Sequence, residues 1–191
     1  MNNSALAILD NDELLHLTRW NLDKGQFGEA LISIKHLLER DDKPIESFRL
    51  GAKIYAQLGL FDHAKKAFDY FLEQQPDALV ERFQYGMVHY DSGDLKSAIE
   101  LWSQVLETEP SYPPALFYRA LALANQGNPD EANKHLDTLI KSAPTDNIYF
   151  DRARKLLKSI EMNRTTPTIA TDDDKHHSLD KYTDDDDRTI N

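Results

Sequence analysis

The stretch GDLKSA, Gly93 to Ala98, belongs to a pattern that recurs through most of the chain. The same spacing from glycine to alanine occurs in GQFGEA, GLFDHA and GNPDEA, and each copy starts 34 residues after the one before. A helical bundle without repeats has apolar periodicity but no fixed long period, so this register indicates a repeat protein. The residues that share the period are Gly25, Gly59, Gly93 and Gly127, then Ala30, Ala64, Ala98 and Ala132, then Pro76, Pro110 and Pro144.

Each repeated position has a physical reason if one repeat is a pair of packed helices. Glycine ends the first helix, because it adopts the left-handed conformation without a Cβ penalty. Alanine allows the second helix to approach the first closely, and a larger side chain would overpack that crossing. Proline ends the second helix, because it cannot continue the hydrogen-bond ladder. The facing positions on the first helices are also small: Thr18, Ala52, Gly86 and Ala120.

These residues resemble the tetratricopeptide-repeat (TPR) pattern, which has the same glycine, alanine and proline positions in a period of 34. The resemblance implies an all-α fold, a right-handed α-solenoid of four TPR helix-turn-helix repeats plus a C-terminal capping helix. Two departures from the pattern are Asn21, where tyrosine is expected, and Arg119, where leucine is usual. The four repeats cover residues 11–44, 45–78, 79–112 and 113–146.

Helix ends are predicted by local signals in the same register. Asp10 followed by Glu13 reads as a capping box that opens the first helix. Asn128 followed by Pro129 predicts a second capped helix start. Both positions agree with the boundaries that the repeat gives.

The segments outside the repeats have a different composition. Residues 1–10 form an N-terminal extension. An apolar stripe of Ile148, Phe150, Ala153, Leu157 and Ile160 predicts a capping helix over residues 147–161. The TPR domain is therefore expected to span residues 11–162. Residues 163–191 carry eight acidic and four basic side chains with few apolar ones, which predicts a disordered acidic tail.

Charge and composition narrow the class of partner. The 191 residues have a formal net charge of −11 and contain no cysteine, so disulfides and cysteine-bound metals are excluded. An acidic chain is repelled by phosphate backbones and by anionic lipid, so neither nucleic acid nor a membrane is expected as a partner. The start of the chain lacks the basic residues and the long apolar run of a signal peptide, which favours a cytoplasmic protein.

No motif for catalysis or cofactor binding occurs in the sequence. The histidines fall at different repeat positions and have no metal-ligand spacing. His176 and His177 beside Asp172 to Asp174 are a weak candidate for a metal site, and a solvated polar tail is the preferred interpretation. We therefore expect no enzyme activity, no cofactor and no metal.

The resemblance implies a binding surface, since first helices of TPR hairpins line a concave groove. Its charged part has Arg49 and Lys53, whereas Met87, Tyr118 and Leu121 are the apolar members least easily explained by packing within a repeat. The alternative for the other aromatic side chains is ordinary packing inside their own hairpins. The full set of candidate residues is Arg49, Lys53, Phe83, Gln84, Met87, Tyr90, Phe117, Tyr118 and Leu121.

Two functions follow from this surface. The first is a scaffold or adaptor that binds a peptide or a partner helix in the concave groove. A clamp for a C-terminal carboxylate is not expected, because the second basic pair of such a clamp is missing. The second is a structural subunit that self-associates or packs into a larger assembly through its solenoid surface. The chain is expected to be a monomer or a weak homo-oligomer, and its protein or peptide ligand is not identified by the sequence.

Overall fold

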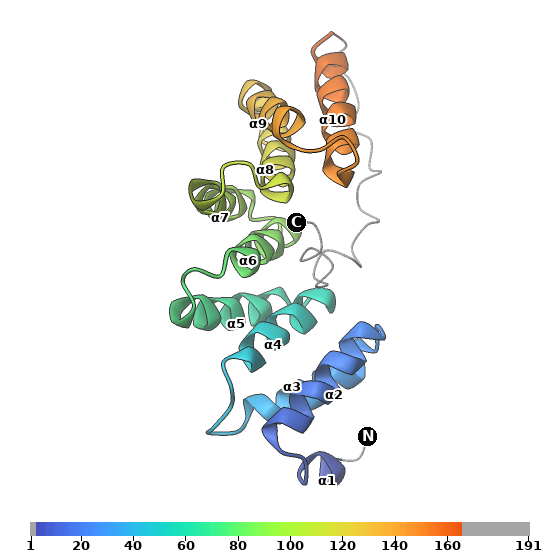
Figure 1. Ribbon diagram of the computed structural model, residues 1–191, viewed down its shortest axis with the longest axis vertical. Helices are drawn as coiled ribbons and strands as arrows, with labels where there is room; N and C mark the ends of the chain where they lie inside the picture. Colours follow the sequence, from blue (N-terminus) through green and yellow to red (C-terminus); the bar gives the residue numbers. More distant parts are fainter. Residues whose placement is uncertain (1–2, 166–191) are drawn as a thin grey trace. The chain divides into compact units, whose positions relative to one another are not determined.

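The computed structural model describes residues 3–165, and every regular element within that range is an α-helix (Figure 1). The helices follow one another through short turns, as the predicted hairpins require. Their bounds are α1 Asn3–Leu6, α2 Asn11–Asp23, α3 Phe27–Leu38, α4 Glu46–Gln57, α5 Phe61–Gln74, α6 Leu79–Asp91, α7 Leu95–Thr108, α8 Pro113–Asn125, α9 Pro129–Ser142 and α10 Ile148–Thr165.

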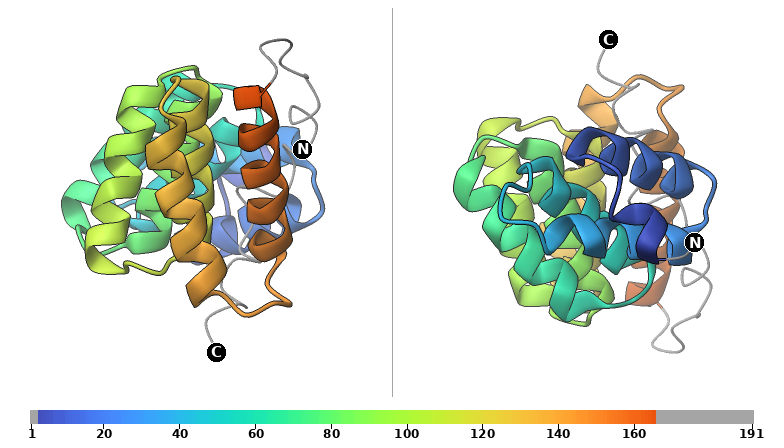
Figure 2. Two further views of the ribbon diagram at one scale, coloured as in Figure 1. Left: turned by 90° about the horizontal axis from the view of Figure 1, so that it is seen from above. Right: turned by 90° about the horizontal axis from the view of Figure 1, so that it is seen from below.

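The described part divides into two compact units, and the boundary between them along the chain falls within α6. The first runs to Glu81 and the second starts at Arg82. In the first unit α2 packs on α3, α4 packs on α5, and α4 also contacts α2 and α3. In the second unit α8 packs on α7 and α9, and α10 lies against both α8 and α9 (Figure 2). The all-α TPR class predicted from the repeat is confirmed.

The turn inside each hairpin has the geometry that its glycine predicts. All four repeat glycines have positive φ, from 67° at Gly25 to 86° at Gly93. The Asp10 side chain accepts a hydrogen bond from the Glu13 backbone N–H at 2.8 Å, and Glu13 accepts one from the Asp10 N–H at 2.9 Å. The capping box is therefore confirmed. Asn128 starts α9 as expected, but its side chain makes no capping hydrogen bond.

The first unit has an aliphatic core that reaches into the N-terminal extension. Ile34 and Leu37 of α3 pack with Leu50 and Ile54 of α4 in one buried cluster. Leu6 of α1 joins this cluster and is only 1% exposed. The extension therefore contributes to the hydrophobic core, a role that the sequence analysis did not predict.

The second unit has a large aromatic side chain at its most crowded crossing. Trp102 of α7 is fully buried and its indole Nε1–H donates to the Phe83 carbonyl oxygen at 3.1 Å. A Cβ atom added to Gly86 of α6 would lie 2.4 Å from that indole nitrogen. Glycine is thus required at residue 86, because the Trp102 indole takes the space that a methyl group needs.

The capping helix differs from the prediction in length and in rotation. It ends at Thr165 rather than at residue 161. Ala153 and Ile160 are buried as predicted, but Ile148 is 63% exposed and Tyr149 is buried in its place. Helix α10 is rotated about its axis relative to the prediction, because Tyr149 packs on aromatic rings of α8. Most of the predicted tail, including His176 and His177, lies outside the described residues.

Candidate functional site

Charged side chains of three first helices form a connected group in the first unit. The Glu46 carboxylate accepts from Arg49, with Nε–Oε2 at 2.8 Å and Nη2–Oε1 at 2.5 Å. The Arg19 Nη2 of α2 donates to the same Glu46 oxygen at 2.9 Å. Arg49 also reaches Glu81 at the start of α6, with Nη1–Oε1 at 3.4 Å. We call Arg19, Glu46, Arg49 and Glu81 the charge ladder.

The charge ladder is partly buried and keeps one accessible cation. The side chains of Glu46, Arg49 and Glu81 are 23%, 20% and 13% exposed, whereas that of Arg19 is 44% exposed. Burial alone would raise the pKa of Glu46, but hydrogen bonds from Arg49 and Arg19 outweigh it and hold that pKa below its ordinary value. Glu46 therefore stays ionised and orients both guanidinium groups.

Two other polar residues of the predicted groove are fully buried. Lys53 of α4 is 1% exposed and Gln84 of α6 is 0% exposed. The side-chain amide of Gln84 has no hydrogen-bond partner for its nitrogen or its oxygen within the described part of the chain. An unpaired buried amide costs roughly 1–3 kcal/mol, so Gln84 lowers the stability of the fold.

The apolar residues of the predicted groove form an internal aromatic cluster of the second unit. Tyr118 of α8 lies at its centre, with its ring centroid 6.0 Å from Phe83, 6.0 Å from Trp102 and 5.3 Å from Phe117. Tyr90 and Tyr149 complete its ring neighbours, at 6.4 Å and 6.2 Å. Such pairs add roughly 0.5–1.5 kcal/mol each beyond the buried area.

Helix α10 covers this cluster on one side. The Arg152 guanidinium carbon lies 4.6 Å from the centroid of the Phe117 ring and 5.6 Å from that of Tyr118. Tyr149 stands 5.7 Å from Phe117. The cation therefore stacks on aromatic faces instead of extending into solvent.

The expectation of an exposed apolar patch is therefore wrong. Met87 is 0% exposed, Phe83 2%, Phe117 4% and Tyr118 6%, while Tyr90 and Leu121 are half-buried. Packing within a single repeat does not explain Tyr118, yet its ring lies beside five other aromatic rings. The physical reason is that its side chain points into the stack of hairpins. The interpretation of Phe83 and Phe117 as packing residues is the one that the structure supports.

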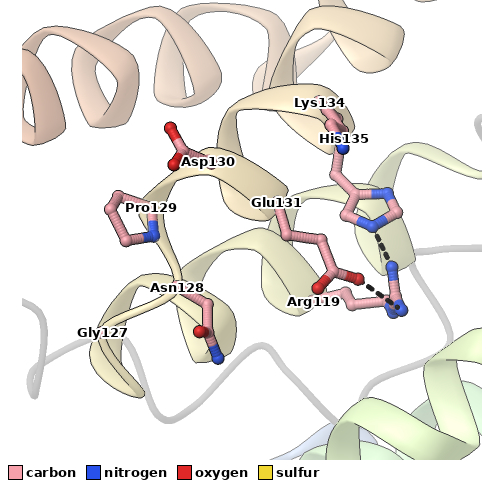
Figure 3. Close-up of a pocket in the computed structure, with 8 residues that line it drawn as sticks. All are labelled: Arg119, Gly127, Asn128, Pro129, Asp130, Glu131, Lys134 and His135. Atoms are coloured by element: carbon pink, nitrogen blue, oxygen red, sulfur yellow. Dashed lines mark hydrogen bonds and ion pairs between the residues drawn. The ribbon is translucent and has the colours of Figure 1, made fainter.

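The unusual Arg119 lines a polar recess at the fourth hairpin (Figure 3). Its guanidinium donates to Ser103 of α7 at 3.1 Å, reaches Glu131 of α9 at 3.3 Å and contacts the His135 ring. Burial, and then the positive charge of Arg119, lower the pKa of His135 to about 4. Arg119 thus replaces the usual leucine as a polar link between neighbouring helices. The remaining lining residues are Gly127, Asn128, Pro129, Asp130 and Lys134.

Two kinds of structural feature are absent from the described residues. Within residues 3–165, no group of three His, Asp or Glu side chains is arranged to hold a metal ion. No helix in the same range has the length and apolar character needed to cross a bilayer.

Known proteins with related sequences and structures contain the same repeat. The tetratricopeptide repeat family matches residues 89–160. DnaJ homolog subfamily C member 3 from Bos taurus is 30% identical over 115 residues, which are 60% of this chain and 23% of that protein. The chain therefore spans about a quarter of this relative.

Two solved structures share the fold. MamA superimposes with a TM-score of 0.63 at 18% identity, covering 78% of this chain and 95% of that one. YrrB, a TPR protein with an unusual peptide-binding site, superimposes with a TM-score of 0.66 at 22% identity. The match covers 72% of this chain and 71% of the YrrB chain. Together with the four-fold period of 34 residues, these findings define the class: the chain is a tetratricopeptide-repeat protein.

Proposed function

We propose that this protein is an interaction scaffold whose first-helix surface binds a peptide through an acidic group. The observation that carries the proposal is the charge ladder, in which Arg19 and Arg49 both bind Glu46 and Arg49 also reaches Glu81. The Arg19 side chain is 44% exposed and shares its carboxylate with Arg49, so its guanidinium is a preorganised site for an acidic group of a ligand. The similarity to YrrB, a TPR protein with a peptide-binding site, supports this choice of ligand.

The ligand carboxylate competes with Glu46 for the two arginines. Arg19 is the entry point, because its side chain is the most exposed member of the ladder. Specificity for one peptide over another then depends on where the acidic group lies in the peptide sequence relative to the other residues that contact the protein.

A selection from displayed random linear peptides with the full chain as bait tests this proposal. We expect bound peptides to be enriched in Asp and Glu. Arg49→Ala should weaken the binding of a selected peptide about tenfold or more, since a charge-assisted hydrogen bond contributes roughly 1.5–3 kcal/mol. Raising the ionic strength should reduce the difference in peptide affinity between Arg49→Ala and the wild type.

Glu46→Gln is a matched variant that is expected to change the affinity for acidic peptides in the opposite direction to Arg49→Ala. It keeps the size of the side chain but removes the charge that occupies Arg19 and Arg49, so acidic peptides should bind more tightly to it. The proposal is wrong if the selected peptides are basic, or if Glu46→Gln weakens acidic peptides while the circular dichroism spectrum stays unchanged.

A further inference from the structure

One exposed aromatic side chain stands out in the first hairpin. Trp20 of α2 is 55% exposed, although the other tryptophan, Trp102, is fully buried. The only described helix before α2 is α1, which has four residues. That short helix buries Leu6 in the core but leaves Trp20 in solvent.

The repeat shows what normally covers the position of Trp20. Its equivalents at intervals of 34 residues are Ile54, Val88 and Ala122, and each of them is 0% exposed. Ile54 packs in the cluster that contains Ile34 of the preceding hairpin. Helix α8, which carries Ala122, likewise packs on α7 of the hairpin before it. The face of α2 that carries Trp20 is thus a surface of the kind that neighbouring helices bury.

The same face of α2 has opposite charges at its two ends. Glu13, Leu17, Trp20 and Lys24 follow one another at spacings of three or four residues, which places them on one side of the helix. Glu13 lies in the first turn and Lys24 at the C-cap. Leu17 is half-buried, and Glu13 and Lys24 are exposed. A stripe that runs from acid through apolar to base is self-complementary when two copies meet antiparallel.

We infer that this stripe binds a second copy of the chain, with two α2 helices packed antiparallel about a two-fold axis. If the two-fold axis crosses α2 at the level of the Thr18–Arg19 peptide bond, Trp20 of each copy lies over Leu17 of the other. The same axis also places Glu13 opposite Lys24 at both ends of the contact. Such an isologous contact closes after two copies, so it produces a dimer and no filament.

The association is expected to be weak, because one helix face supplies less than the roughly 1,200–2,000 Å² of a stable interface. It is a second interaction surface, separate from the charge ladder. Neither depends on the other, so a peptide-binding defect and a dimerisation defect can be told apart.

Sedimentation equilibrium of the full chain over a range from about 10 µM to 1 mM tests the inference, a range that brackets weak complexes. The average mass should rise above the monomer value of 21.9 kDa with concentration. Iodide quenching provides a second readout at the same concentrations. Trp102 is inaccessible, so the quenchable signal reports Trp20 and should fall as the dimer forms.

Three variants separate this contact from others. Trp20→Ala should abolish the rise in mass, and Lys24→Glu should weaken association about fivefold or more by opposing Glu13. Tyr70→Ala removes another aromatic side chain, 45% exposed on α5, and should leave the mass curve unchanged. A constant monomer mass overturns the inference. A rise in mass that survives Trp20→Ala, or that Lys24→Glu leaves unaltered, overturns it as well.

Discussion

The close approach of Trp102 to Gly86 allows a sharp test of the packing of the second unit. Gly86→Ala adds one methyl group, and its Cβ would lie 2.4 Å, 2.8 Å and 2.9 Å from three atoms of the Trp102 indole. Trp102 is fully buried, so the ring has little room to move. The substitution therefore forces the indole away from Phe83, whose carbonyl oxygen it binds at 3.1 Å.

The expected net effect is a loss of about 1–5 kcal/mol in the free energy of unfolding, with a midpoint of about 3 kcal/mol. Alanine improves helix propensity by about 1 kcal/mol. Overpacking costs roughly 1–3 kcal/mol, and a buried indole N–H that loses its acceptor costs roughly 1–3 kcal/mol more. For a chain of this size the midpoint of this range lowers the melting temperature by about 6–12 °C.

Gly51→Ala is the matched control for this experiment. Gly51 is also a helical glycine, but its added Cβ would meet Leu38 Cδ1 at 3.3 Å, the end of a flexible side chain. That variant should melt within about 1–2 °C of the wild type, because the contact and the gain in propensity nearly cancel. Thermal melts followed by circular dichroism at 222 nm measure the melting temperatures of both variants. A Gly86→Ala protein that melts at or above the wild-type temperature would refute the crowding argument.

The remaining predictions concern single side chains. Tyr118→Ala should destabilise the fold by about 3 kcal/mol or more in urea denaturation, since it empties the centre of the aromatic cluster. Gln84→Met should stabilise it by about 1 kcal/mol, because an unpaired buried amide is replaced by an apolar group of similar size; a loss of stability would show that the amide has a partner. The pKa of His135 falls from an ordinary 6.5 to about 4, so the unfolded chain binds the extra proton first and stability should decline as pH falls from 6.5 to 4. His135→Gln should flatten that decline, and equal pH profiles for the two proteins would contradict the assignment. Asp94 caps α7 through the Ser97 N–H, so Asp94→Ala should cost about 1 kcal/mol at neutral pH.

The period of 34 residues was enough to predict the hairpins and their turns. Gly25 and its equivalents depend only on local backbone geometry, and the capping box of Asp10 and Glu13 depends only on a spacing of three. Both were therefore readable from the sequence. Leu6 was missed because the apolar run from Ala5 to Leu9 is too short to show a periodicity.

The candidate groove was harder to predict, because burial depends on which hairpin lies beside a first helix. Leu50, Gln84 and Tyr118 share one repeat position and are all buried, whereas His16 at the same position of the first repeat is exposed. The large side chains Leu50 and Tyr118 at this position were a usable signal of packing. The Arg19–Glu46 and Arg49–Glu81 ion pairs gave no such signal, since they join residues 27 and 32 positions apart. The third pair of the ladder, Glu46–Arg49, has a local spacing of three residues.

The central claim is that the charge ladder is the binding surface for an acidic peptide. The most direct measurement is an NMR titration of the isotope-labelled full chain with a selected acidic peptide, observing the arginine Nε–H signals. We predict shifts at Arg49 and Arg19 that saturate together with the backbone signals of α2 and α4. Saturable binding with the Arg19 and Arg49 signals unmoved, and with shifts confined to other helices, would contradict the claim.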